Sequence, residues 1–359
     1  MKRSGLALLS LLLTASAPLC ANAQVFAGKT ITMVINYGAG GNVDSEGRIF
    51  ERHLHKHIAG KPIIIVQNVP GAGGLTAVNQ MGMGVGVKDP STTIGFVTFN
   101  PMAILTDDPA LRVKVDTFAM IASVGGYYVV YGRKELLEPS GKPQDILKGP
   151  KIHAAGFARS SVHDVRLRLM LDLLKADYQI VTGFQSSGAV NLAMVQNEIN
   201  FMLSSAPAYE NQVVPNLINK GVATPLWQIA TVGTDGKLSG SDKMQADGVP
   251  FFEDVYRLAH GKAPDGVTYR ALRIINDLRA QLARAIMMPP GASPAAVEEM
   301  RHAVESLAKD KEFIADYLRI TKEEPILIDG ATAQKLVKDA VSGLPPEVKV
   351  LLKEAAGVN

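Results

Sequence analysis

Runs of apolar residues, separated by small and polar residues, divide the chain into short buried strands that each lead into a helix. The first run, Ile31–Ile35, enters the glycine-rich turn Tyr37–Gly41 and then a predicted helix from about Val43 to Ile58. The continuous apolar run within Lys61–Gln67 is typical of a parallel strand that helices cover on both faces. This alternation predicts a doubly wound α/β domain, in which ligands bind beyond the carboxyl ends of the strands.

The same alternation returns in a second block of the chain. The strand Lys151–Ala155 leads into the turn Gly156–Ser161 and a helix, and the polar turn Phe184–Gly188 precedes another helix. Two such blocks predict two α/β lobes with a ligand cleft between them. We expect residues 24–124 and 240–359 to form the first lobe and residues 125–239 the second. Farther on, the 3–4 spacing of apolar residues predicts that Val267–Met288 is mostly helical.

The first 23 residues have the pattern of a secretory signal peptide. Lys2 and Arg3 precede the apolar core Leu6–Leu13, and Ala21-Asn22-Ala23 is a small-x-small cleavage site. The apolar core is shorter than the roughly 20 residues that span a bilayer, which disfavours a membrane anchor. The only cysteine, Cys20, leaves with this segment, so the mature chain has no disulfide and no thiolate chemistry. We therefore expect an exported protein.

Charge and length limit the partners of the mature chain. The net charge of the full sequence is +3, and removal of Lys2 and Arg3 leaves 35 basic residues against 34 acidic ones. Without a basic block or an aromatic–basic stripe, nucleic acid is an unsuitable partner. No stretch after the signal peptide is apolar enough to span a membrane, so we expect no membrane insertion after cleavage. The length suits two domains.

Two glycine-rich turns are candidate anion sites. A turn of this kind before a helix directs free backbone N–H groups and the positive end of the helix dipole at one point. The first turn spans Tyr37–Asp44, where Asn42 or Asp44 can cap the helix, and the second spans Pro70–Gly74. The dinucleotide fingerprint fails at both turns, because its third glycine falls on Val43 or Thr76. We therefore expect no nucleotide and no other cofactor.

Metal and nucleophilic chemistry are both disfavoured. His53 and His57 are four residues apart on a predicted helix and could share a metal, but no zinc-protease pattern accompanies them, so we predict no metal site. Ser160 and Ser161 lie near His163 and Asp164, but the Gly-x-Ser-x-Gly motif is absent. A serine before a helix is more simply a cap or a donor to a ligand, and we expect no catalytic residue.

Arg159 leaves two interpretations open. Its guanidinium lies in a turn of small residues and could clamp a ligand carboxylate through two hydrogen bonds. It could equally form a salt bridge with Asp164 or Asp44. The aromatic cluster Tyr127, Tyr128 and Tyr131 is better interpreted as packed strand residues than as a binding surface.

These motifs together resemble the Bug family, the periplasmic solute-binding receptors of tripartite tricarboxylate transporters. The likeness covers nearly the whole mature chain, and the Asn-x-Pro-Gly-Ala-Gly-Gly turn is its most specific part. The matching segments are Tyr37–Asp44, Asn68–Gly74, Gly156–His163, Phe184–Ala189 and the Pro-Pro-Gly-Ala-Ser-Pro stretch at 289–294. In the family the turn of the second lobe is usually neutral, whereas here Arg159 adds a charge.

The resemblance implies a two-lobed periplasmic-binding-protein (Venus flytrap) fold that closes on a small mono- or dicarboxylate. It also implies a periplasmic, monomeric, non-enzymatic receptor that delivers its ligand to a membrane permease. A periplasmic sensor for a signalling kinase, or a serine hydrolase on the same scaffold, are the alternatives. The implied ligand-binding residues are Tyr37, Gly38, Ala39, Gly40, Gly41, Asn42, Asp44, Ala72, Gly73, Gly74, Asn100, Phe157, Arg159, Ser160, Ser161, His163, Phe184, Ser186, Ser187 and Ser204.

Overall fold

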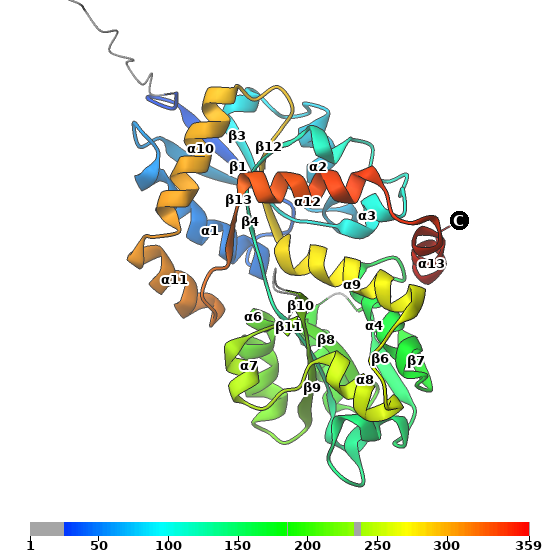
Figure 1. Ribbon diagram of the computed structural model, residues 1–359. Helices are drawn as coiled ribbons and strands as arrows, with labels where there is room; N and C mark the ends of the chain where they lie inside the picture. Colours follow the sequence, from blue (N-terminus) through cyan, green and yellow to red (C-terminus); the bar gives the residue numbers. More distant parts are fainter. Residues whose placement is uncertain (1–24, 185, 233–237, 359) are drawn as a thin grey trace, which may run out of the picture.

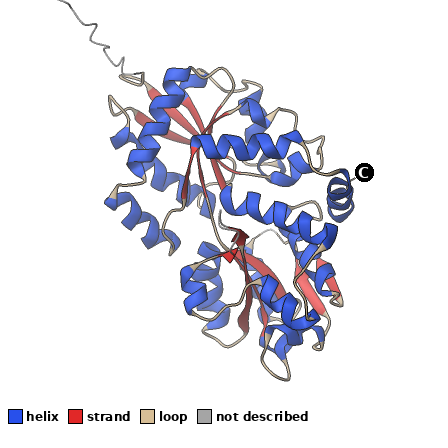
Figure 2. Ribbon diagram, viewed as in Figure 1, coloured by secondary structure: helices blue, strands red, loops and turns tan. Residues whose placement is uncertain are grey.

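The chain forms two α/β lobes that lie one above the other in Figure 1. The structure is a computed structural model that describes residues 25–184, 186–232 and 238–358, so the expected signal peptide lies outside the described residues. We call the six-stranded sheet with its helices the first lobe and the five-stranded sheet with its helices the second lobe. Figure 2 shows helices around both sheets. Among the described helices, none combines the length and the apolar character needed to cross a membrane.

The first-lobe sheet is mixed. Its strand order is β13-β4-β12-β3-β1-β2, with β1 parallel to both β2 and β3, and β12 antiparallel to β3 and β4. The parallel half is the part that the apolar runs predicted. The strands are β1 (Thr30–Ile35), β2 (Ile63–Asn68), β3 (Thr93–Thr98), β4 (Ala119–Val124), β12 (Arg284–Met288) and β13 (Leu327–Asp329).

Helices cover both faces of this sheet, as the doubly wound prediction required. Along β1, Ile31, Met33 and Ile35 pack into one core and Val34 packs into the other. Residues of α1 (Asn42–Leu54), α10 (Pro294–Leu307) and α11 (Lys311–Thr321) complete the first core. Residues of α2 (Leu75–Gly82), α3 (Pro101–Leu105) and α12 (Gly330–Ser342) complete the second.

The second-lobe sheet has the order β7-β6-β8-β5-β9. Its strands are β5 (Tyr128–Arg133), β6 (Ile152–Ala155), β7 (Tyr178–Val181), β8 (Phe201–Ser205) and β9 (Ala223–Ile229). The helices that we assign to the second lobe are α4 (Val162–Leu174), α5 (Ser187–Val195), α6 (Ala206–Ala208), a π-helix (Tyr209–Ile218), α7 (Asp242–Ala246), α8 (Phe252–His260), α9 (Gly266–Gln281) and the C-terminal α13 (Pro346–Ala356).

Smaller elements complete the fold. A two-stranded ribbon pairs β10 (Thr231–Val232) with β11 (Leu238–Ser239). Short 3₁₀ turns occupy His55–His57, Ala72–Gly74, Pro90–Thr92, Val115–Thr117, Lys134–Leu137 and Pro143–Leu147.

The prediction of one long helix over Val267–Met288 is wrong at its end. Helix α9 stops at Gln281, and Arg284–Met288 is the strand β12 in the middle of the first-lobe sheet. Leu282 and Ile286 are spaced like helical neighbours, which produced the error. A strand buried on both faces is apolar throughout, so it lacks the polar positions that would have distinguished it from a buried helix.

The segment after residue 240 lies partly against the second lobe. The Phe252 ring of α8 packs 5.8 Å from Trp227 of β9, and Met244 of α7 joins the core around Tyr131. The division of the lobes at residue 240 stays a prediction. These contacts instead favour a return of the chain to the first lobe at Arg284.

Candidate ligand site between the lobes

Strand register brings the carboxyl ends of both sheets together. In the first lobe, Thr98 at the end of β3 is paired with Arg284 of β12, which is paired in turn with Val124 at the end of β4. In the second lobe, Tyr128 at the start of β5 is paired with Ser205 at the end of β8. Only three residues separate Val124 from Tyr128. The turns after β1, β2 and β3 therefore face the turns after β6, β7 and β8, and we call these segments the facing turns.

The first facing turn leaves the start of α1 without a side-chain cap. Gly41 is the N-cap residue, so the expectation that Asn42 or Asp44 caps this helix is wrong. Asp44 is only 3% exposed and accepts hydrogen bonds from Gly40 N, Arg48 Nε and Asn68 Nδ2. Burial raises the pKa of Asp44, but these hydrogen bonds outweigh it and hold the pKa below its ordinary value. Asp44 thus positions the turn as an ionised carboxylate.

The second facing turn needs glycine at several positions. Gly71, Gly73 and Gly74 all have positive φ, and a Cβ on Gly74 would lie 2.3 Å from Nδ2 of Asn36. Asn36 is 1% exposed, and its amide bonds with Gly74 O, Thr98 O and Thr98 N. The Tyr37 hydroxyl donates to Gly73 O over 3.4 Å. One buried amide therefore fixes the first, second and third turns relative to one another.

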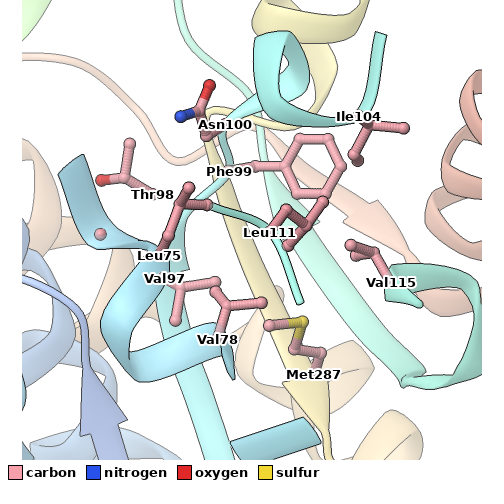
Figure 3. A pocket seen from close by; sticks show the side chains of 11 residues that line it. Leu75, Val78, Val97, Thr98, Phe99, Asn100, Ile104, Leu111, Val115 and Met287 are labelled. Atoms are coloured by element: carbon pink, nitrogen blue, oxygen red, sulfur yellow. The ribbon is translucent and has the colours of Figure 1, made fainter. Parts of the chain in front are cut away.

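The third facing turn carries polar atoms that have no hydrogen-bond partner among the described residues. These are the Thr98 hydroxyl and the side-chain amide oxygen (Oδ1) of Asn100, both buried. Figure 3 shows both on one side of a cavity, away from the apolar side chains of Val78, Val115 and Met287. The cavity measures about 20 Å³, which is enough for one water molecule. A bound solute would have to reach Thr98 and Asn100 from the side of the facing turns.

Most helix starts at the facing turns differ between the two lobes. In the first lobe α1, α2 and α3 follow three neighbouring parallel strands, and each begins without a side-chain hydrogen bond at its N-cap. In the second lobe Ser161 caps α4 and Ser186 caps α5, whereas the three-residue α6 after β8 begins without a side-chain cap. The first N–H groups of a helix have no partner inside the helix, so α1 and α3 present such groups at one sheet edge. At the start of α2, Leu75 N donates to Ala72 O and Thr76 N donates to Gly71 O.

In the second lobe, Asp164 organises the turn after β6. Its Oδ1 accepts from Phe157 N and Ser161 Oγ over 2.9 Å each, and it lies 3.2 Å from His163 Nδ1. His163 Nε2 lies 2.8 Å from the Leu203 carbonyl. A catalytic triad requires the serine hydroxyl on the histidine and the histidine on the acid. Here the Ser161 hydroxyl bonds to the acid, and a backbone oxygen occupies the outer histidine nitrogen.

Arg159 forms neither of the salt bridges that the sequence left open. Within the described residues it forms no ion pair with Asp164 or Asp44. Its Nη2 donates weakly to Glu354 O over 3.5 Å, and Arg168 of α4 donates to Ala355 O over 2.6 Å. Two arginines therefore satisfy carbonyl groups at the C-terminal end of α13, where the helix dipole favours positive charge.

The remaining predicted residues of the second lobe lie along the same edge. Phe184 N donates to Gly156 O, which ties the turn after β7 to the turn after β6. Ser187 begins α5, and Ser204 is paired with Val129 and is 8% exposed. Ser160 is exposed. The intervening Gln185 lies outside the described residues.

Comparison with known proteins agrees with this architecture. No family model matches the chain, and no curated protein matches it by sequence. The solved periplasmic binding protein BugD is 14% identical, with a TM-score of 0.62 over 92% of this chain and 98% of that one. MatC from Rhodopseudomonas palustris, solved with bound malate, is 17% identical, with a TM-score of 0.59 over 90% and 98%. Another R. palustris protein, solved with adipate, is 14% identical, with a TM-score of 0.61 over 92% and 97%.

The chain has the fold of the tripartite tricarboxylate-type periplasmic binding proteins. The resemblance and the two-lobed α/β fold predicted from the sequence are thus confirmed at the level of the fold. In this binding-protein fold, the chain crosses between the lobes at Gly125-Gly126, where Gly125 N donates to Ile326 O and Gly126 N to Ala280 O, each over 2.8 Å. A Cβ on Gly125 would lie 2.8 Å from Ala280 O, so this crossing has no room for a side chain.

A second contact joins the lobes of the binding-protein fold beyond this crossing. Asn211 Nδ2 in the second lobe donates to Ile320 O of α11 over 3.0 Å. Glu323, just after α11, lies close to Glu210, Lys243 and Ser241 of the second lobe. Burial and the Glu210 carboxylate raise the pKa of Glu323 to about 8, against the opposing effects of Lys243 and Ser241.

The histidines of the predicted metal alternative have other partners. His53 Nε2 lies 3.2 Å from Asp316 Oδ2, and His57 Nε2 lies 2.8 Å from Asp310 Oδ2, both on or beside α11. Within the described residues, no group of three potential ligands is placed to hold a metal ion.

A polar cavity of about 370 Å³ lies at the opposite end of the second-lobe sheet, beside Arg133, Lys151 and His153.

Sequence reasoning missed four side chains that shape the site. Asn36 directly follows β1 and Asn68 is the last residue of β2, so the polar residue at each strand end was an available signal. Arg166 and Arg279 lie in the amphipathic helices α4 and α9, and both are buried. A charge within an apolar helical face is a signal of this kind, but the helix pattern alone does not show what surrounds it.

Proposed function

We propose that this protein is a periplasmic solute-binding receptor that captures a small organic carboxylate between its lobes and delivers it to a membrane permease of the tripartite tricarboxylate type. One observation carries the proposal. Three neighbouring helices of the first lobe begin at one sheet edge without side-chain caps, while α4 and α5 opposite are capped by their own serines. Unsatisfied N–H groups and helix dipoles favour an anion.

The charge around these helix starts favours a carboxylate over a phosphate. Asp44 already places an ionised carboxylate in the first turn of α1, held by Gly40, Arg48 and Asn68. A second carboxylate, with a smaller charge than a phosphate, suits the N–H groups that remain. The solved relatives MatC and the adipate-bound protein carry dicarboxylates in their own structures, which supports the same class of ligand here.

We assign the predicted ligand residues to two roles. In the first lobe, backbone groups of Gly38, Ala39, Gly41, Asn42, Ala72, Gly73 and Gly74 face the ligand, with Tyr37 and Asn100 at the border. In the second lobe, Phe157, Ser160, His163, Phe184, Ser187 and Ser204 complete the enclosure. Gly40, Asp44, Ser161 and Ser186 instead hold the turns in shape through their own hydrogen bonds.

Capture would proceed by closure of the lobes. A ligand bound on the backbone donors of the first lobe favours the closed form when the second lobe adds contacts. The crossing at Gly125-Gly126 and the contact between Asn211 and Ile320 would change together in such a motion. Periplasmic location, cleavage of the signal peptide, a monomeric state and the absence of enzymatic activity belong to the same proposal. The hydrogen bond from Ser161 to Asp164 argues against the hydrolase alternative.

Isothermal titration calorimetry on the mature protein tests the proposal. The panel contains mono-, di- and tricarboxylates together with the amide of each acid, which has the same shape without the charge. We expect at least one acid to bind at least about 100-fold more tightly than its amide, because charged hydrogen bonds are worth about 1.5–3 kcal/mol each. Binding of neutral solutes, with no response to any acid, would refute the proposal.

A further inference from the structure

Two arginines are buried without an acidic partner near the facing turns. Arg166 is 1% exposed and Arg279 is 8% exposed. The Arg166 guanidinium lies 4.2 Å from the centre of the Tyr128 ring, and the Arg279 guanidinium lies 5.5 Å from the same ring. Arg166 Nε donates to Asn276 Oδ1 over 2.8 Å, and Arg279 Nη1 donates to Ala283 O over 2.8 Å. Among the described residues, neither arginine forms an ion pair, and Arg166 Nη2 has no hydrogen-bond partner.

Two other arginines of this chain that are nearly as buried form ion pairs with acidic residues. Arg284 pairs with Glu46 over 2.7 Å, and Arg273 pairs with Glu253 over 3.3 Å. Burial, together with the positive charge of Arg279 and against the effect of Tyr128, lowers the pKa of Arg166 to about 9. The guanidinium remains charged at neutral pH. A buried charge without a counter-charge is costly, although the aromatic ring offsets part of the cost.

The position of this pair connects it to the ligand site. Arg166 follows His163 by three residues on α4, so the two side chains lie on neighbouring positions of one helix face. Tyr128 comes directly after the crossing between the lobes and is paired with Ser205 at the end of β8. Arg279 lies one residue before Ala280, which accepts the hydrogen bond from Gly126. Tyr37 of the first facing turn is close enough to affect the pKa of Arg279.

We propose that Arg166 and Arg279 make the ligand site selective for doubly charged anions, with the bound ligand supplying the negative charge that no ion pair supplies to them. Glu46 acts on Arg279 electrostatically, but its carboxylate is paired with Arg284. This inference rests on the proposed function, and it names dicarboxylates as the ligand class. The arginines act through their field rather than by contact, because both are covered by protein. The interior screens such charges less than bulk water does, so the effect reaches across several ångströms.

Calorimetry with acids that differ by one carboxylate tests the inference. The probes are succinate against butyrate and adipate against hexanoate, each titrated into the full mature protein. We expect the wild-type protein to bind the dicarboxylate of each pair at least about tenfold more tightly. Arg166→Gln and Arg279→Gln should each reduce this ratio severalfold. Arg166→Lys keeps the charge and should retain most of the ratio.

The matched control is Arg168→Gln, which removes the same charge from the same helix on the side that faces α13. It should leave the ratio unchanged. The ratio is the decisive readout, because structural damage weakens both acids alike. An unchanged ratio in Arg166→Gln and Arg279→Gln, or equal binding of both acids by the wild-type protein, overturns this inference and leaves the proposed function intact. If the wild-type protein binds none of the four acids or any other carboxylate, both fail.

Discussion

The side-chain amide of Asn36 forms two hydrogen bonds with the backbone of Thr98. Its Nδ2 donates to Thr98 O over 3.1 Å, and Thr98 N donates to its Oδ1 over 2.9 Å. The pair continues the ladder between β1 and β3 beyond Ile35, at the point where β1 turns away into the first facing turn. Because the same amide also bonds to Gly74 O, it holds all three facing turns of the first lobe.

Asn36→Ala should therefore destabilise the protein well beyond a typical substitution. The change leaves Thr98 N and two carbonyl oxygens without their partner in a buried site, which should cost about 2–4 kcal/mol. Urea denaturation measures the free energy of unfolding. Asn42→Ala, at an exposed position beginning α1, is the control and should stay within about 0.5 kcal/mol of wild type. Equal effects of the two variants would contradict the bracing role of Asn36.

Alanine substitutions at Gly73 and Gly74 distinguish the cost of backbone strain from the cost of a steric conflict. Both have positive φ, 95° and 62°, but a Cβ on Gly74 would meet Asn36 at 2.3 Å whereas one on Gly73 meets nothing within 4 Å. Gly73→Ala should cost only the backbone strain, about 1–2 kcal/mol. Gly74→Ala should cost at least about 1 kcal/mol more, because the Asn36 amide must move. Thermal unfolding monitored by circular dichroism compares them, and an equal loss in both would contradict this reading of the turn.

Arg159 should act on the C-terminal helix rather than on the ligand. Arg159→Ala removes a weak exposed hydrogen bond to Glu354 O, so it should cost less than about 1 kcal/mol of stability. Hydrogen exchange of the backbone amides in α13 should accelerate, while carboxylate affinity stays within about twofold of wild type. A loss of more than about tenfold in affinity would return Arg159 to the role of a carboxylate clamp.

Glu323 should make stability fall as pH rises. Its pKa in the folded protein is raised from 4.5 to about 8, so the folded state holds this proton more tightly than the unfolded state. The contribution is complete below pH ~4.5 and is lost as pH rises towards the folded pKa. Between about pH 5 and pH 8, we expect a decline of about 1 kcal/mol per pH unit from this group.

Urea denaturation across that pH range checks this prediction. Glu323→Gln should flatten the decline, because glutamine resembles the protonated acid. The neighbouring Glu324 is exposed, so Glu324→Gln is the matched control and should keep the wild-type slope. The same dependence would favour closed lobes at lower pH, since Glu323 and Glu210 belong to different lobes. Identical slopes in wild type and Glu323→Gln would contradict the raised pKa of Glu323 in the folded protein.

The parallel core and its facing turns were predictable because their signals are local. Apolar runs that end in Gly-rich turns predicted β1 and β2, and small polar residues before α4 and α5 predicted the caps. Strand β12 was not predictable, because four consecutive buried apolar residues satisfy a helix and a strand equally. The return of the chain from the second lobe is a long-range event that no neighbouring residue encodes.

The contacts of charged residues were the least predictable part of the site. Arg159 lies in a turn that the sequence placed correctly, yet its partner is a carbonyl of α13, almost 200 residues away. Asp44 was expected to cap α1, but it instead accepts three hydrogen bonds that order its own turn. Long side chains choose among several neighbours, and those neighbours are set by tertiary packing.

Amide NMR shifts on titration with succinate, malate and adipate are the strongest test of carboxylate binding at the helix starts of the first lobe, because they report both binding and its location. We predict that the largest shifts fall on the amides of Asn42, Val43 and Asp44 at the start of α1 and on Gly73 in the turn before α2. Amides beside Arg133 and Lys151, at the opposite end of the second lobe, serve as the internal control and should not move. Absence of shifts with all three acids, or shifts confined to the control region, would contradict carboxylate binding at these helix starts.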